Sequence, residues 1–146
     1  PKGENQEFTK ALEMLGLGLE RRLDDKVGLL SGGQRQAITL IMATMQKPKL
    51  LLLDEHTAAL DPKTAAKVLD ITDQVVNQSQ LTTLMITHNM NDAIRHGNRL
   101  IMMDEGRIIL DIQGEEKKKL TVDQLLKLFA QAGGENALSD RMLLHN

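Results

Sequence analysis

The sequence contains no cysteine, no tryptophan and no tyrosine, and only two phenylalanines among its 146 residues. Without cysteine there is neither a disulfide framework nor a thiolate metal site, which fits a cytosolic protein. The scarcity of aromatic rings argues against recognition of nucleic acid by base stacking. A net charge of −2 supplies no field that would draw the chain to nucleic acid or to anionic lipid. No apolar run is long enough to cross a bilayer, so we expect any membrane role to come through a partner.

The rest of the composition is that of an ordinary globular domain. Hydrophobic residues make up 41% of the chain and charged residues 26%. A chain of this length can bury a substantial core and suggests a single domain. No internal repeat is visible, so the local patterns have to be read one after another.

The first half of the chain alternates helical and strand patterns. The spacing of apolar residues predicts a helix over 4–15, which ends at two glycines. A second helix is predicted over 32–46 and ends before Pro48. Its predicted inward stripe consists of Ala37, Ile38, Ile41 and Met45. Residues 50–53 show no polar alternation, which predicts a parallel strand covered on both faces.

The pattern continues with a helix, a strand and a short helix. Asp61 followed by Pro62 is a matched start signal for the first of these. Its predicted buried face consists of Ala65, Val68, Leu69, Thr72, Val75 and Val76. A strand is predicted over 81–87 and a short helix over 89–96. This order of elements predicts an α/β fold with a partly parallel sheet.

The last third contains a hairpin and a further helix. Two strands, at 100–103 and 107–111, flank a turn made of Asp104, Glu105 and Gly106. The charged run 115–119 is interpreted as a solvated turn. Residues 121–124 have the form of a capping box and predict a helix as far as Ala132.

Two short segments stand out chemically. In Leu30–Ala37 (LSGGQRQA), a serine and two glycines open a helix. Ser-x-x-Gln is a capping box, yet a cap alone does not need two glycines, which weaken a helix. Glycines there would let a phosphate approach the backbone N–H groups, where the helix dipole favours its charge. In Leu50–Glu55 (LLLLDE), a strand delivers two adjacent carboxylates to its exposed end, where we expect them to alternate in direction and so to serve different tasks.

In this order and at this spacing, the two segments resemble the signature motif and the Walker B motif of ATP-binding-cassette (ABC) ATPases. The resemblance extends over about 4–111 and is most specific between 29 and 61. It implies the C-terminal part of a P-loop NTPase (RecA-like) core with part of the α-helical signature subdomain. The implied divisions are 1–46, a partial signature subdomain; 47–112, the latter half of the ATPase core; and 113–146, a C-terminal helical extension.

The resemblance also implies roles for individual residues. Ser31, Gly32, Gly33 and Gln34 would contact the γ-phosphate of ATP held by an opposing subunit. Asp54 would help to hold Mg²⁺, usually through water, and Glu55 would orient and deprotonate the attacking water.

Three further residues fall at or near family motifs. Asp61 closes the segment Ala58–Asp61, which matches the D-loop that reaches across the dimer. His88 follows a strand and matches the switch histidine, which would hydrogen-bond the γ-phosphate. His56 stands where most ABC ATPases have proline. No second histidine lies at a metal-ligand spacing from it, so we interpret it as a tolerated loop residue.

Family elements that normally precede the signature are absent from this sequence. It has no Gly-x-x-x-x-Gly-Lys-Ser/Thr loop, no aromatic residue to stack on adenine and no Q-loop glutamine. We therefore expect a C-terminal fragment that does not hydrolyse ATP alone. With its P-loop layer missing, it should expose apolar surface and either self-associate or be one piece of a longer chain.

The resemblance is to bacterial importer-type ABC transporter subunits. It implies a head-to-tail dimer with a second ATPase subunit, docked on transmembrane permease subunits at the cytoplasmic face of the membrane. Membrane contact would come only through the permease, and no nucleic acid would be bound. An alternative is the C-terminal lobe of a chromosome-maintenance or DNA-repair ABC-type ATPase. Such a lobe should follow coiled-coil heptads, which 1–28 lack. A degenerate, non-hydrolysing module is a third alternative.

Overall fold

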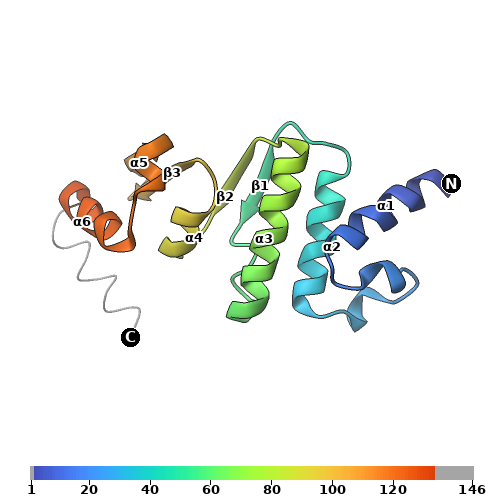
Figure 1. Ribbon diagram of the computed structural model, residues 1–146. Coiled ribbons are helices and arrows are strands. Elements are labelled where there is room, and N and C mark those ends of the chain that lie inside the picture. Colours follow the sequence, from blue (N-terminus) through green and yellow to red (C-terminus); the bar gives the residue numbers. More distant parts are fainter. Residues whose placement is uncertain (1, 134–146) are drawn as a thin grey trace. The chain divides into compact units, whose positions relative to one another are not determined.

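The computed structural model describes residues 2–133, which form two compact units, and the boundary along the chain lies between Ile86 and Thr87. The elements of the first unit are α1 (Lys2–Met14), two 3₁₀ turns η1 (Leu19–Arg21) and η2 (Val27–Leu29), α2 (Gly32–Thr44), β1 (Leu51–Asp54), α3 (Pro62–Ser79) and β2 (Thr83–Ile86) (Figure 1). Those of the second are α4 (Met90–Arg95), β3 (Arg99–Asp104), β4 (Arg107–Gln113), α5 (Gly114–Lys118) and α6 (Val122–Gly133). The predicted order of helices and strands is confirmed except for α5, which was not predicted. The parallel pair β1–β2 and the antiparallel pair β3–β4 form separate sheets, so the expectation of one partly parallel sheet is wrong for the described residues.

In the first unit, β1 and β2 pair in parallel and α3 is the crossover between them. Leu51 and Leu53 face a core that includes buried residues of α1, α2 and α3. The opposite face of the pair carries Leu52, which is 64% exposed, together with Leu84 and Ile86, each 51% exposed. The expectation that the strand is covered on both faces is therefore wrong for the described residues of this unit, because its helices pack against one face only. The expected exposed apolar surface is present.

Helix α2 buries a stripe that differs from the predicted one at its end. Its buried positions are Gly33, Ala37, Leu40, Ile41 and Thr44. Met45 is 40% exposed, and Ile38 is only half-buried. Positions three, four and seven residues after Ala37 lie on one face, and Met45, the next on that stripe, is already the C-cap that follows the last helical residue. A polar residue can take the last place because the Thr44 hydroxyl donates to Leu40 O at 2.9 Å.

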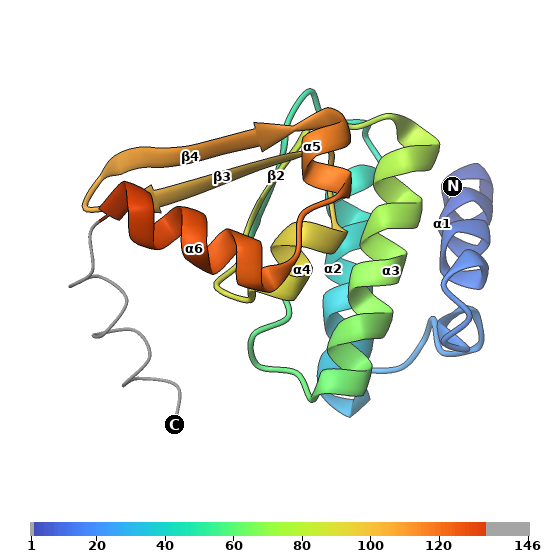
Figure 2. The ribbon, with the colours of Figure 1, turned by 60° about the vertical axis from the view of Figure 1, so that its left-hand side comes forward.

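In the second unit, the hairpin of β3 and β4 lies alongside α6 (Figure 2). Glu105 (φ 48°) and Gly106 (φ 75°) form its two-residue turn, and paired positive φ values are typical of a type I′ hairpin. Among residues 87–133 of this unit, four apolar side chains are buried, namely Leu100, Ile112, Leu125 and Phe129. The predicted hairpin is confirmed.

The interpretation of 115–119 as a solvated turn is confirmed for the exposure of Glu115, Glu116, Lys118 and Lys119, but it is wrong about the turn and about Lys117. The segment belongs to helix α5, and Lys117 is only 3% exposed. Its Nζ donates to the carbonyl oxygens of Ile94 (2.7 Å), His96 (3.0 Å) and Gly97 (2.9 Å). An ammonium group has three donors, and the end of a helix offers carbonyls without partners, so each satisfies the other. Lys117 thus fixes the C-terminal end of α4.

The helix starts predicted at Asp61 and at Thr121 are present. The Asp61 carboxylate accepts from Thr64 N–H at 3.0 Å at the start of α3. Thr121 and Gln124 exchange the two hydrogen bonds of a capping box before α6. None of the helices within residues 2–133 has the length and apolar character that crossing a bilayer requires.

Candidate functional site

Helix α2 begins with a complete capping box. The Gln34 N–H donates to Ser31 Oγ (3.2 Å), and the Ser31 N–H donates to Gln34 Oε1 (3.0 Å). Helix geometry leaves the N–H groups of Gly32 and Gly33 without an intrahelical acceptor, because the first turn of a helix has none to offer. The start of α2 therefore presents backbone donors at the positive end of the helix dipole, a suitable place for an anion.

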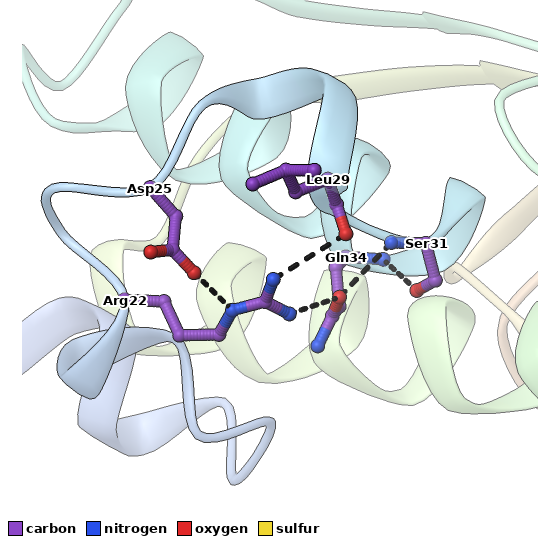
Figure 3. A network of polar contacts seen from close by, with 5 residues as sticks. All are labelled: Arg22, Asp25, Leu29, Ser31 and Gln34. Carbon is purple, nitrogen blue, oxygen red and sulfur yellow. Dashed lines mark hydrogen bonds and ion pairs between the residues drawn. The ribbon is translucent and has the colours of Figure 1, made fainter.

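A polar network holds the segment before α2 against this helix start (Figure 3). Arg22 Nε donates to Asp25 Oδ2 at 2.6 Å, and Arg22 Nη2 donates to Leu29 O at 3.3 Å. Arg22 Nη1 also approaches Gln34 Oε1, at 3.4 Å. Because Gln34 Oε1 already accepts from Ser31 N–H, both donors converge on the same oxygen. The amide nitrogen of Gln34 therefore points away from them (Figure 3).

The two glycines of this segment also serve helix packing. Gly33 is buried, and a Cβ added there would collide with Thr64 Cγ2 on α3. A Cβ at Gly32 would lie 3.1 Å from Leu60 Cδ2. From the sequence, both glycines are assigned to phosphate access. Their packing role could not be predicted because the neighbours, Leu60 and Thr64, lie about thirty residues away along the chain. The same contacts place the segment before α3 directly against the start of α2.

The two carboxylates do not alternate along a strand as expected. Asp54 is the last residue of β1, where it pairs with Ile86, and its side chain is exposed. Glu55 has already left the strand with φ 47°, and its N–H donates to Ile86 O at 2.9 Å. A non-glycine residue in this left-handed region is strained. The relative direction of the two side chains is therefore set by this backbone turn.

The loop after Glu55 is a succession of turns that ends at the cap of α3. The Ala58 N–H donates to Glu55 O, and the Leu60 N–H donates to Thr57 O, both at 3.1 Å. The Asp61 carboxylate then accepts from the Thr64 hydroxyl at 2.6 Å as well as from its N–H. The Thr64 hydroxyl first, and its N–H second, hold the pKa of the Asp61 carboxyl below its usual value. Asp61 is thus ionised under ordinary conditions and ordered by the helix it starts.

His56 is more than a tolerated loop residue. It is half-buried, and its Nε2 lies 3.0 Å from Thr72 Oγ1 in the middle of α3. Sequence reasoning missed this contact because the two residues are sixteen positions apart. The amphipathic pattern of α3, which places Thr72 on its buried face, was the available signal.

The remaining predicted residue, His88, belongs to the second unit. It is exposed and lies between β2 and α4. The next residue, Asn89, caps α4 by accepting from Asp92 N–H at 3.1 Å. The segments 31–34 and 54–61 all belong to the first unit.

The described residues hold no cluster of three or more histidine, aspartate or glutamate side chains that could bind a metal ion. Asp54 offers a single exposed carboxylate at the end of a parallel strand. Mg²⁺ commonly binds through one or two carboxylates, several waters and the phosphates of a substrate. The site therefore suits Mg²⁺ that arrives with a nucleotide, and it does not suit a metal held by protein ligands alone.

Comparison with known proteins supports the resemblance. The family model described as ABC transporter matches residues 3–58. A tyrosine transport ATP-binding protein of Clostridioides difficile is 51% identical over 121 residues, which are 83% of this chain and 48% of that protein. A crystal structure of an ATP-binding cassette of an ABC transporter in its ADP conformation superposes with a TM-score of 0.66 at 29% identity, over 85% of this chain and 48% of the other. The chain belongs to the ATP-binding domains of ABC transporters.

The ABC family also accounts for the fold. An aliphatic sulfonates import ATP-binding protein of Albidiferax ferrireducens is 39% identical over 111 residues, which are 76% of this chain and 39% of that protein. The α/β arrangement of the model is that of part of a P-loop NTPase domain, as predicted. The chain spans about half the length of the curated relatives it matches. The relatives named here belong to transporters, and none is a DNA-repair or chromosome-maintenance ATPase.

Proposed function

We propose that this ABC chain supplies the signature and catalytic half of an ATP-hydrolysing subunit in an importer-type transporter. The single observation that carries the proposal is the capped, glycine-opened start of α2 packed against the segment that ends at Asp61. The proposed phosphate-binding site and the segment proposed to reach a neighbouring subunit therefore lie next to each other. The names of the related import proteins support the transport class.

In this proposal, the start of α2 binds the γ-phosphate of ATP held by a second, head-to-tail subunit. Each side chain of the capping box accepts from the backbone N–H of the other residue, so the N–H groups of Gly32 and Gly33 are the main donors left for the phosphate. The Gln34 amide nitrogen is directed away from its capping partners and adds a further donor. Recognition by backbone N–H groups suits the charge and shape of a phosphate.

Asp54 and Glu55 perform different tasks because one ends the strand and the other begins the turn. Asp54 would hold Mg²⁺, and the ion when bound neutralises charge on the phosphates. Glu55 would accept a proton from the attacking water and orient it. His88 would hydrogen-bond the γ-phosphate, and Asp61 would contact the neighbouring subunit while capping α3.

The partners in this proposal are a second ATPase subunit and transmembrane permease subunits. The chain would act at the cytoplasmic face of the membrane and reach the bilayer only through the permease. Closure of the dimer would assemble the complete site and expel water from it, which couples hydrolysis to transport. The proposed divisions remain a partial signature subdomain at 1–46, half of the ATPase core at 47–112 and a helical extension at 113–146.

The chain alone should not turn over ATP, because its sequence has no Gly-x-x-x-x-Gly-Lys-Ser/Thr loop to hold the α- and β-phosphates. Steady-state phosphate release and equilibrium nucleotide binding test this directly. Turnover above background by the isolated chain would contradict the proposal.

Matched variants test the residue roles within a complete ATP-binding subunit that carries this chain. Glu55→Gln should reduce kcat about a thousandfold, since it removes the proton acceptor. Glu105→Gln is the control, because Glu105 is also an exposed glutamate with positive φ. Ser31→Ala and Thr121→Ala each remove one capping box, yet only Ser31→Ala should reduce hydrolysis. Equal loss in both capping variants would assign Ser31 to stability alone.

A further inference from the structure

His56 has no role in the proposed reaction, yet the structure gives it a specific partner. Its Nε2 lies 3.0 Å from Thr72 Oγ1, and Thr72 is 4% exposed in the middle of α3. Both residues belong to the first unit. The bond therefore joins the loop that follows β1 to the body of the α3 helix.

The direction of this hydrogen bond follows from the other bond of Thr72. The Thr72 hydroxyl donates to Val68 O at 2.8 Å. A hydroxyl has one proton and two lone pairs, so Thr72 Oγ1 is left to accept. His56 must then donate through an Nε2–H group. The neutral ring is thus held as the Nε2–H tautomer.

The bond acts on the residue that precedes His56. The Glu55 N–H is anchored to Ile86 O, and Glu55 O accepts from Ala58 N–H. Between these anchors, the Glu55 backbone has φ 47°, a conformation that a glutamate does not prefer. The hydrogen bond of the His56 side chain to Thr72 restricts backbone rotation on the C-terminal side of Glu55. It therefore opposes relaxation of the turn toward an unstrained conformation.

We propose that His56 is a positioning residue for Glu55, acting through its Nε2–H bond to Thr72. The assignment deepens the proposed function, because it concerns the geometry of the group that accepts the proton. Loss of the bond should loosen the turn without removing any group that touches ATP. Loss of the bond should therefore lower kcat, whereas KM for ATP should stay close to its original value.

The first test concerns the bond itself and needs no activity. Long-range ¹H–¹⁵N spectra of the labelled chain, at a pH where the ring is neutral, should show His56 as the Nε2–H tautomer. Thr72→Val keeps the shape of the side chain and removes the acceptor, while Thr72→Ser keeps the hydroxyl. The valine variant should show mixed tautomers and a shifted Glu55 amide resonance, and the serine variant should resemble the original chain. An Nδ1–H tautomer, or an unmoved Glu55 amide in Thr72→Val, would overturn the assignment.

The second test measures hydrolysis in a complete ATP-binding subunit that carries this chain. Thr72→Val should lower kcat about tenfold with KM retained, whereas Thr72→Ser should stay within about twofold. His56→Gln places an amide N–H near the position of Nε2 and should retain most of the rate of the original subunit. If the original subunit hydrolyses ATP and Thr72→Val keeps full kcat, the positioning role is overturned. If the original subunit does not hydrolyse ATP, the proposed function fails, and the tautomer still decides whether the bond exists.

Discussion

At the scale of single residues, two glutamates share an unusual backbone conformation with positive φ. Four non-glycine residues have positive φ in the described part of the chain, and Glu55 and Glu105 are among them, at 47° and 48°. Glu105 lies in a hairpin turn where positive φ is part of the turn type. Glu55 lies beside the end of a parallel strand, in a turn that asparagine or glycine would fit better. Strained residues of this kind concentrate at functional sites.

Replacement by glycine separates strain from function at these two positions. Glu55→Gly and Glu105→Gly should each stabilise the chain, by about 0.5–1 kcal/mol, because glycine adopts positive φ without steric cost. Urea unfolding of the chain measures both. If Glu55→Gly destabilises the chain, the glutamate side chain stabilises the turn by more than its positive φ costs, and the prediction of net strain at Glu55 is wrong.

At the scale of elements, helix α2 depends on a glycine for its approach to α3. Gly33→Ala should cost about 1–3 kcal/mol of unfolding free energy, because the new Cβ meets Thr64 Cγ2. Adding Thr64→Ser removes that methyl group and keeps the hydroxyl that donates to Asp61, so it should restore most of the loss. Gly28→Ala is the control, since no neighbour lies within 4 Å of its added Cβ. Denaturant midpoints that do not separate Gly33→Ala from Gly28→Ala would refute this packing role.

Helix α4 depends in the same way on a residue from another element. Lys117→Met keeps the length of the side chain and removes three donors to the carbonyls of Ile94, His96 and Gly97. It should destabilise the second unit by roughly 2 kcal/mol. Lys118→Met is the matched control, because Lys118 is exposed and pairs only with exposed Glu115. Amide exchange of α4 and α5 measures the effect, and equal protection in both variants would contradict it.

These elements show how far the sequence alone could lead. The caps at Asp61 and Thr121 are local signals, with every partner within three residues, and both are confirmed. The partners of Lys117, His56 and Gly33 are brought to them by the fold, from at least sixteen residues away. Periodicity can place Thr72 on the buried face of α3, but it does not say which distant residue meets it there. The motifs of the site could therefore be predicted, while the contacts that hold them in place could not.

At the scale of the whole molecule, one face of the β1–β2 pair is apolar and open in the described residues. Leu52, Leu84 and Ile86 lie there, each at least half exposed. Burial of such a face is worth roughly 25 cal/mol for every Å² removed from water. The isolated chain should therefore self-associate, with an average mass that rises with concentration.

Light scattering of the chain tests this expectation. Replacing Leu52 and Leu84 by threonine keeps strand propensity and should shift the mass toward that of the monomer. Ile108→Thr, at a residue of similar exposure on the hairpin, is the control and should leave association unchanged. A chain that stays monomeric at every concentration would contradict the prediction.

The parallel pairing of β1 with β2 also affects when these strands can pair during synthesis of the chain. Leu51 pairs with Thr83, so β1 leaves the ribosome roughly thirty residues before its partner. At about 5–20 residues per second, the wait is roughly two to six seconds. The β3–β4 hairpin, by contrast, can close within microseconds once both strands are made. Nascent β1 thus stays available to a chaperone that binds short apolar stretches for far longer than either strand of the hairpin.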